Sequence, residues 1–168
     1  MIDIHSHLLP EVDDGSADFA TSLEMLKEET RQGVTDVILT PHYRANCLTD
    51  KDDLKKRFDE FKSQVAAEGV NINLYLGQEI FAFERVDKAL KEGKLFTMNG
   101  TDYVLVEFSM KRESDISEIV YMLKNNGYIP IVAHIDRYYY ADVEVAREIK
   151  ELGGLHCSIP YCGSGCHS

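Results

Sequence analysis

The chain begins with the stretch Met-Ile-Asp-Ile-His-Ser-His, residues 1–7, which combines a strand pattern with two histidines. Ile2 and Ile4 predict one buried face of a short strand, and His5 and His7 lie two residues apart. Because side chains alternate along an extended backbone, both imidazoles project to the same side of this strand. Two imidazoles on one face can bind one metal ion, so we expect the strand to end at a metal site.

Four further apolar runs, rich in β-branched and aromatic residues, predict buried parallel strands. These runs cover residues 34–40, 70–76, 103–108 and 129–134. Amphipathic stretches predict helices at residues 17–32, 50–68, 84–92, 115–126 and 141–152. Strand and helix thus alternate about five times. Such alternation is typical of an α/β fold with right-handed crossovers, either an open doubly wound sheet or a (β/α) barrel.

Histidines and glutamates at the strand ends favour the barrel. Beyond the first strand, the later strands end at or are followed by His42, Glu79, Glu107 and His134. In a barrel of parallel strands the active site gathers at the carboxyl ends of the strands, so distant parts of the sequence converge there. An open sheet would more often carry a glycine-rich phosphate loop after its first strand, and the sequence has neither the dinucleotide-binding nor the P-loop glycine motif.

Each of these residues also has a simpler interpretation. A single buried histidine is more often a core residue than a ligand, and Glu107 could cap a helix or pair with a lysine. The conjunction of four histidines and two glutamates at strand ends favours a metal-dependent hydrolase. Asp13 and Asp14 remain undecided on spacing alone, because Asp-Gly is common turn chemistry and an aspartate or Ser16 could cap the next helix.

Composition narrows the class of protein. The 168 residues, 44% of them hydrophobic, suit a single globular domain. We expect a cytoplasmic protein without membrane insertion, because the sequence shows no long apolar run and no signal-peptide pattern. A net charge of −11 disfavours nucleic acid as a partner. The four cysteines are spaced too unevenly for a disulfide framework.

Five motifs together resemble those of a known family. They are Asp-Ile-His-Ser-His-Leu-Leu-Pro-Glu-Val-Asp-Asp-Gly-Ser at 3–16, Thr-Pro-His-Tyr at 40–43, Gly-Gln-Glu-Ile at 77–80, Val-Glu-Phe-Ser at 106–109 and Ala-His-Ile-Asp-Arg-Tyr at 133–138. In this order the chain resembles the bacterial manganese-dependent protein tyrosine phosphatases of the polymerase and histidinol phosphatase (PHP) superfamily, which regulate capsule and exopolysaccharide synthesis. The resemblance runs from Met1 to about Gly154.

The resemblance implies a distorted (β/α)7 TIM-like barrel and up to three divalent metal ions. Manganese is the usual metal, with iron, zinc or magnesium as alternatives. The metal ligands that the motifs imply are His5, His7, Asp14, His42, Glu79, Glu107 and His134. Within this set Glu79 matches the carboxylate that bridges two ions, and Asp14 with His42 matches ligands of a third. Arg137 matches the arginine that contacts the phosphate.

The chemistry of these residue types agrees with that implication. Imidazole and carboxylate ligands suit manganese, iron or zinc, and a site with several such ions activates water for attack on phosphorus. A guanidinium at Arg137 would hold the phosphoryl oxygens, with Arg44 as a second candidate. The cysteine-based tyrosine phosphatase mechanism is excluded, because no cysteine is followed by five residues and then arginine.

The chain departs from the family near its end. We expect a phosphatase domain at residues 1–154, a barrel truncated after about five β/α units, because the late Asp-x-His motif of the family is absent. Residues 155–168 are expected to form an atypical cysteine-rich tail, for which a zinc knuckle (Cys-x4-Cys-x3-Cys-His) is the alternative. An unclosed barrel would expose strand edges and apolar surface, which favours a homo-oligomer or dependence on a missing segment.

The predicted function is a metal-dependent phosphotyrosine-protein phosphatase. Its expected partner is the phosphotyrosine tail of a bacterial tyrosine kinase that controls polysaccharide export. A different class of function is a catalytically impaired remnant that binds the metal or the kinase. Within the enzyme class the alternatives are histidinol phosphatase and the polymerase-associated exonuclease. The negative charge argues against the exonuclease, and the Asp-Asp-Gly and Ala-His-Ile-Asp-Arg-Tyr motifs favour the tyrosine phosphatase.

Overall fold

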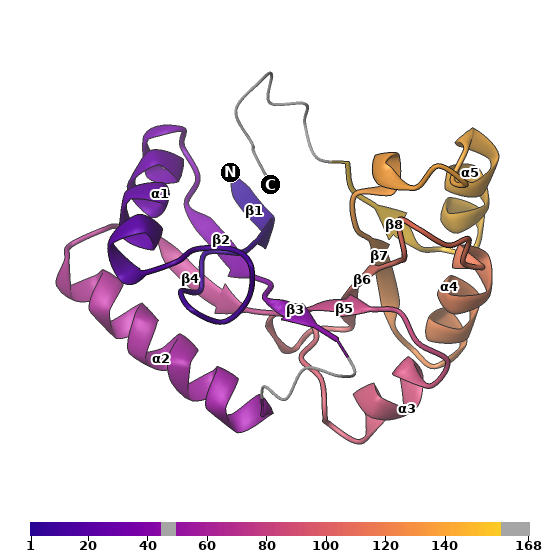
Figure 1. Cartoon of the computed structure of the whole chain (residues 1–168), viewed down its shortest axis with the longest axis horizontal. Coiled ribbons are helices and arrows are strands. Elements are labelled where there is room, and N and C mark those ends of the chain that lie inside the picture. The colour runs from indigo at the N-terminus through magenta and orange to yellow at the C-terminus, as the bar shows by residue number, and fades with distance from the viewer. Residues whose placement is uncertain (45–49, 159–168) are drawn as a thin grey trace.

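Parallel strands form a curved row, with helices on its outer side (Figure 1). The computed structural model describes residues 1–44 and 50–158. Its strands are β1 (Ile2–Ser6), β2 (Asp36–Leu39), β3 (His42–Tyr43), β4 (Asn73–Leu76), β5 (Glu79–Phe81), β6 (Tyr103–Glu107), β7 (Ile129–Val132) and β8 (Leu155–His156). Its α-helices are α1 (Phe19–Arg31), α2 (Lys51–Ala67), α3 (Val86–Lys91), α4 (Ile116–Asn125) and α5 (Val143–Glu151). Short 3-10 helices, η1 (Met98–Gly100) and η2 (Ile135–Arg137), complete the described elements.

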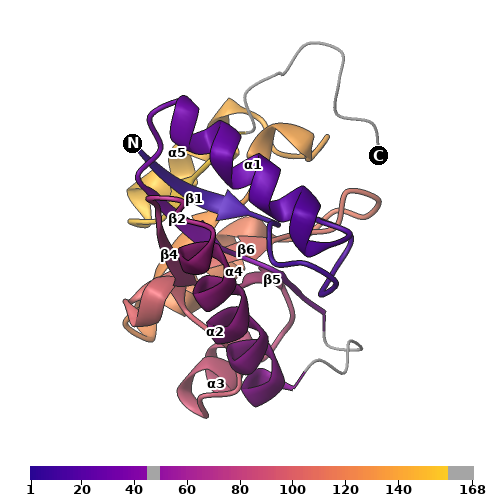
Figure 2. The ribbon, with the colours of Figure 1, turned by 90° about the vertical axis from the view of Figure 1, so that its left-hand side faces the viewer.

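The strands belong to two sheets. One has the order β1-β2-β4 and the other β3-β5-β6-β7-β8, and every strand pair in them is parallel. Parallel strands joined through helices confirm the α/β class expected from the alternation of elements. Figures 1 and 2 show α1 and α2 outside β1, β2 and β4, and Figure 1 shows α4 and α5 outside the strands at the other end of the row.

The chain crosses from the three-stranded sheet to the five-stranded sheet twice, each time just before an expected ligand. After β2 comes Pro41, which has no N–H to donate to a neighbouring strand, and the chain then enters β3 at His42. After β4 comes Gly77, where a Cβ atom would lie 3.0 Å from Met98 Sδ and 3.2 Å from Ile38 Cγ2, and β5 then begins at Glu79. His42 and Glu79 therefore lie inside short strands of their own.

The helices lie close to their expected positions. Each observed helix begins one or two residues after the expected start and ends one residue before the expected end. Local chemistry fixes these boundaries. The Asp18 carboxylate accepts a hydrogen bond of 2.7 Å from the Thr21 backbone N–H at the start of α1. At the other end Gly33 has φ of 86°, a left-handed conformation that costs glycine least.

Two apolar clusters fill the space between the strands and the helices. The first joins β2 and β4 to α1 and α2 through residues such as Leu26, Val37, Leu54 and Leu74. The second joins β5, β6 and β7 to α3, α4 and α5, and its members include Ile80, Val104, Val120, Val132 and Ile149. Each fully buried aliphatic side chain stabilises the fold by about 1.5–3 kcal/mol relative to exposure. The strands are thereby held rigidly enough to fix residues at their ends.

The prediction of a buried Ile2 and Ile4 face was wrong. Ile2 is 62% exposed and Ile4 is 37% exposed. The reason is position, because β1 stands at one end of its sheet and pairs, among the described strands, with β2 alone. In the same strand His5 is only half-buried, whereas Ser6 is buried.

The sheet continues past the boundary expected at residue 154. Leu155 and His156 form β8, which pairs with β7 at Ile131 and Val132. Cys157 is a free thiol. Cys47 and the candidate zinc-knuckle residues Cys162, Cys166 and His167 lie outside the described residues.

The part of the chain that the structure describes contains no helix long and apolar enough to cross a lipid bilayer.

One buried carboxylate weakens the fold at neutral pH. Burial and the charge of nearby Asp3 raise the pKa of Glu29 to about 7, and its Oε2 atom has no hydrogen-bond partner among the described residues. The folded state therefore favours the protonated acid. The stability gained from protonation of Glu29 in the folded state is fully present below the ordinary pKa of 4.5 and is lost as the pH rises through 7.

We expect Glu29→Gln to raise the free energy of unfolding by about 1 kcal/mol at about pH 8, and the gain to vanish below about pH 4. The gain is smaller than the pKa shift alone implies, because the side chain is only half-buried. Urea unfolding at both pH values measures the gain. Glu28→Gln is the matched control, since hydrogen bonds from Gln32 and Arg31 lower the pKa of exposed Glu28. An equal gain at both pH values would contradict this explanation.

Candidate metal centre

Six of the expected ligands meet where β1, β2, β4, β6 and β7 end, and two of them, His42 and Glu79, open the short strands β3 and β5 that follow β2 and β4. His5 comes from β1, His42 from β3, Glu79 from β5 and Glu107 from β6, while His7 follows β1 and His134 follows β7. Glu79, Glu107 and His134 are 0%, 3% and 3% exposed. Distant parts of the sequence thus converge on one buried polar cluster, as the strand-end pattern predicts.

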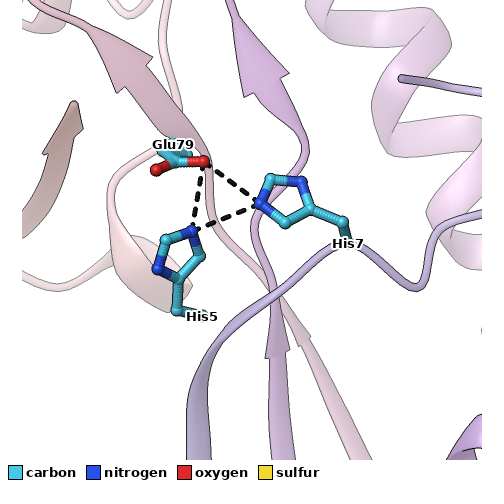
Figure 3. A group of neighbouring side chains, drawn as sticks. All are labelled: His5, His7 and Glu79. Carbon is cyan, nitrogen blue, oxygen red and sulfur yellow. Dashed lines mark hydrogen bonds and ion pairs between the residues drawn. The ribbon is translucent and has the colours of Figure 1, made fainter. Parts of the chain in front are cut away.

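Glu79 lies at the middle of this cluster. Its Oε2 atom is 3.1 Å from His5 Nε2, 3.1 Å from His7 Nε2 and 3.1 Å from His42 Nδ1. Its Oε1 atom is 2.9 Å from His134 Nε2. Figure 3 shows Glu79 facing both His5 and His7, whose Nε2 atoms are 3.2 Å apart. One carboxylate therefore contacts all four imidazoles.

Glu107 shares two of these histidines with Glu79. Its Oε1 atom lies 3.0 Å from His42 Nδ1, and its Oε2 atom lies 3.9 Å from His134 Nε2. Three groups of side chains have ligand atoms close enough together to hold an ion: His5, His7 and Glu79; His7, Asp13 and His42; His42, Glu79 and Glu107. These groups overlap, so the cluster has room for more than one ion with shared ligands.

The two aspartates of the loop after β1 have different places. Asp13 Oδ2 lies 2.9 Å from His7 Nδ1 and accepts a hydrogen bond of 2.9 Å from the His42 backbone N–H, while its Oδ1 accepts one from Gly15. Asp13 thus directs Nε2 of His7 toward Glu79, as carboxylates do for metal-binding histidines. Asp14 is 76% exposed and its Oδ1 lies 3.4 Å from His42 Nε2, so its oxygens remain free for a ligand.

Two backbone features hold the cluster in shape. Gly15 packs so closely against His7 that a Cβ atom would lie 2.2 Å from the His7 carbonyl oxygen. His134 has φ of 32° and ψ of 53°, a left-handed conformation that costs a residue other than glycine about 1–2 kcal/mol. Such strain persists where the surroundings impose it, often at functional sites. Neither the strain at His134 nor the role of Asp13 carries a clear signal in the sequence.

Mutual electrostatics lower the pKa of the Glu79 carboxyl and raise the pKa of the His5 and His7 imidazoles. Burial opposes the charge of Glu79, but His134, His5 and His7 around it hold the pKa of its carboxyl well below the ordinary range. Burial likewise opposes the charge of His5 and His7, yet Cys157 and Glu79 raise the pKa of His5 to about 9, and Asp13 and Glu79 raise that of His7 to about 10. Without a cation, the buried Glu79 carboxylate therefore needs protonated imidazoles beside it.

The donor set fits divalent cations better than it fits internal hydrogen bonding. Four buried atoms of the cluster lack a hydrogen-bond partner among the described residues: His42 Nδ1, Glu79 Oε2, Glu107 Oε1 and His134 Nδ1. Three of these atoms, His42 Nδ1, Glu79 Oε2 and Glu107 Oε1, lie within about 3 Å of a nitrogen or oxygen atom of opposite charge, but not in hydrogen-bond geometry. Nitrogen and carboxylate oxygen atoms that converge without pairing are typical of ligands that face a shared ion.

The two arginines stand at the rim. Arg44 Nε lies 3.9 Å from Glu107 Oε1, with 58% of its side chain exposed. Arg137 lies in η2, three residues after His134, and is exposed. The structure thus brings Arg44, the second candidate from the sequence, to the cluster, and leaves Arg137 exposed to solvent in η2.

Comparisons with known proteins agree with this geometry. The family model for capsular polysaccharide synthesis, CpsB/CapC, matches residues 1–159. Tyrosine-protein phosphatase YwqE of Bacillus subtilis is 34% identical over 92% of this chain and 59% of its own length. Tyrosine-protein phosphatase CpsB of Streptococcus agalactiae is 33% identical over 94% of this chain and 65% of its own. This chain therefore spans about three fifths of the length of these curated relatives.

A solved structure has the same arrangement of elements. It comes from a crystallographic study of YwqE from Bacillus subtilis and CpsB from Streptococcus pneumoniae, described there as unique metal-dependent tyrosine phosphatases. The superposition has a TM-score of 0.85 at 31% sequence identity and covers 93% of this chain and 65% of the other.

We expect divalent cations to stabilise the fold through this cluster. Free Mn²⁺ at about 100 times its Kd should raise the Tm by roughly 5–10 °C, because binding to the folded state alone adds about 2.7 kcal/mol. His42→Ala should weaken binding by about 100-fold and remove most of this shift. His156→Ala, an exposed histidine of β8, is the matched control. Thermal unfolding with Mn²⁺ or EDTA measures both, and an unchanged shift in His42→Ala would rule His42 out as a ligand.

Proposed function

The chain belongs to the CpsB/CapC family of capsular polysaccharide synthesis proteins, and on this basis we propose that it is a metal-dependent phosphotyrosine-protein phosphatase. The observation that carries the proposal is the cluster of four imidazoles around the buried Glu79 carboxylate. The names of the relatives support the same reaction, and the motifs from residue 3 to residue 138 lie in the matched region.

We propose a distorted (β/α)7 barrel as the architecture, to which this chain contributes about five β/α units. The curved row of parallel strands and the likeness to the solved relative support this proposal. The phosphatase domain proposed for residues 1–154 would also include residues 155 and 156, because β8 pairs with β7. The cysteine-rich tail would then begin after β8.

We propose that the centre holds up to three ions. His5, His7 and Glu79 would hold the first, Glu79, Glu107 and His134 the second, and Asp14 with His42 the third. The mixed nitrogen and oxygen ligands suit manganese, with iron, zinc or magnesium as alternatives. When bound, such ions lower the pKa of a coordinated water and neutralise negative charge on the phosphoryl oxygens.

The side chains of the protein would orient and stabilise the reacting groups. Asp13 fixes the ring of His7, so that Nε2 faces the centre. Arg137 and Arg44 would bind the phosphoryl oxygens from the rim, where forked guanidinium donors match their geometry. Arg44 already lies beside Glu107, and Arg137 would approach when the phosphate binds. Because these groups favour the charge of the transition state, their loss should affect turnover more than folding.

The proposed substrate is the phosphotyrosine tail of a bacterial tyrosine kinase that controls capsule or exopolysaccharide synthesis. The family description supports a role in capsular polysaccharide synthesis. We propose that the protein acts in the cytoplasm, and that the exposed Ile2 and Ile4 face of β1 promotes homo-oligomers.

We expect Mn²⁺-dependent hydrolysis of p-nitrophenyl phosphate and of a phosphotyrosine peptide, abolished by EDTA. Arg137→Ala should lower kcat/KM for both by about 10²–10³, because a donor to the transition state is lost. Arg147→Ala, an exposed arginine of α5, is the matched control. Phosphate release measures each rate.

Two results would overturn the proposal. Faster hydrolysis of histidinol phosphate than of the phosphotyrosine peptide would make the protein a histidinol phosphatase. Mn²⁺ binding without any hydrolysis would favour the alternative of a metal- or kinase-binding protein without catalysis.

A further inference from the structure

A groove of about 530 Å³ opens at the carboxyl ends of β5 and β6, beside the metal centre. The loop after β5, the loop after β6 and the first turn of α4 form its walls. None of its lining residues belongs to the expected ligand set. The groove is therefore a separate surface that shares an edge with the centre.

The strands connect the groove directly to the buried carboxylates. Phe81, which lines the groove, lies two residues after Glu79 on β5, so both side chains project to the same side of the strand. Phe81 also pairs in register with Glu107 on β6, and Phe108 of the groove follows Glu107. A ligand held at Phe81 would thus lie beside the two carboxylates of the centre.

Aromatic side chains form the wall nearest the centre. Phe81 is 36% exposed, and Phe83 is half-buried with its ring 6.2 Å from that of Tyr43. Phe108 is fixed from behind by Tyr138, whose ring it meets edge to face at 6.0 Å and whose hydroxyl accepts its backbone N–H at 2.9 Å. Phe108 is itself only 2% exposed, so Phe81 offers the accessible aromatic face, and such a face favours a flat aromatic ligand.

The other wall is acidic. Glu84, Glu113, Asp115 and Glu118 line the groove, against one cation, Arg112. Four carboxylates against one guanidinium give this wall a surplus of negative charge. A ligand that extends along the groove would therefore be favoured if it carried a positive charge there.

We propose that this groove binds the substrate peptide, with the phosphotyrosine ring against Phe81 and Phe83 and a neighbouring lysine or arginine facing the carboxylates. The inference rests on the phosphatase function proposed above and specifies its substrate. The volume exceeds that of one phenyl ring, which leaves space for the flanking residue. The groove would thus select aryl phosphates in basic peptides over phosphoserine in the same context.

The test uses peptides with a non-hydrolysable phosphonate in place of the phosphate and the Mn²⁺-loaded 168-residue chain. Calorimetry compares a phosphotyrosine analogue and a phosphoserine analogue, both with lysine neighbours. Phe81→Ala should lower the ratio of their affinities about tenfold, because an aromatic contact is lost only to the aryl ligand. Tyr103→Ala is the matched control, since Tyr103 is 40% exposed at the opposite end of β6.

The acidic wall is tested by a charge change on the surface, which leaves the core untouched. Glu84→Lys combined with Glu113→Lys should weaken binding of the lysine-flanked analogue about tenfold and strengthen binding of a glutamate-flanked one. An unchanged aryl selectivity in Phe81→Ala, or no dependence on the flanking charge, would overturn the proposal. Because these are binding measurements, they test the peptide groove even if the chain proves inactive as a phosphatase. If the groove variants leave hydrolysis unchanged, the phosphatase function would stand without the proposed groove.

Discussion

The burial of Glu79 among four imidazoles is the interaction on which the rest of the site depends. A carboxylate with no exposed surface is costly unless positive charge compensates it. Here the raised pKa values of His5, His7 and His42 favour their positive charge beside Glu79, His134 adds a hydrogen bond, and in the proposed loaded state cations would contribute as well. Removing a proton from either of the two most basic imidazoles, His5 or His7, without supplying a cation would leave that carboxylate underpaired. Proton and metal binding at this centre are therefore coupled.

The parallel arrangement of the strands brings the imidazole and carboxylate side chains together. Every strand pair is parallel, and the ligands lie at or shortly after the carboxyl ends of β1, β2, β4, β6 and β7, with His42 and Glu79 as the first residues of β3 and β5. The two crossings into the five-stranded sheet, after Pro41 and Gly77, place His42 and Glu79 in short strands paired with each other. Asp13, in the loop after β1, contacts both the His7 ring and the backbone N–H of His42 through its carboxylate. Phe81, two residues after Glu79 on β5, lies between this cluster and the proposed peptide groove.

Local patterns predicted much of this arrangement. Helical periodicity and glycine stops placed the five helices within two residues, and the strand-end pattern identified six side chains that do meet. The failures have physical reasons. Ile2 and Ile4 have the pattern of a buried face, but burial depends on what lies opposite, and β1 is the last strand in its row. The place of Arg44 beside Glu107 and the orienting contacts of Asp13 depend on tertiary distances that no local spacing records.

In the proposed metal centre, Glu79 would be shared between two ions. Electron paramagnetic resonance of the chain loaded with successive equivalents of Mn²⁺ tests this most directly, because ions that share a carboxylate are close enough for their spins to couple. We predict an exchange-coupled spectrum once a second equivalent binds, and its loss in Glu79→Gln. A spectrum of isolated Mn²⁺ at every loading, or coupling that survives Glu79→Gln, would contradict the account.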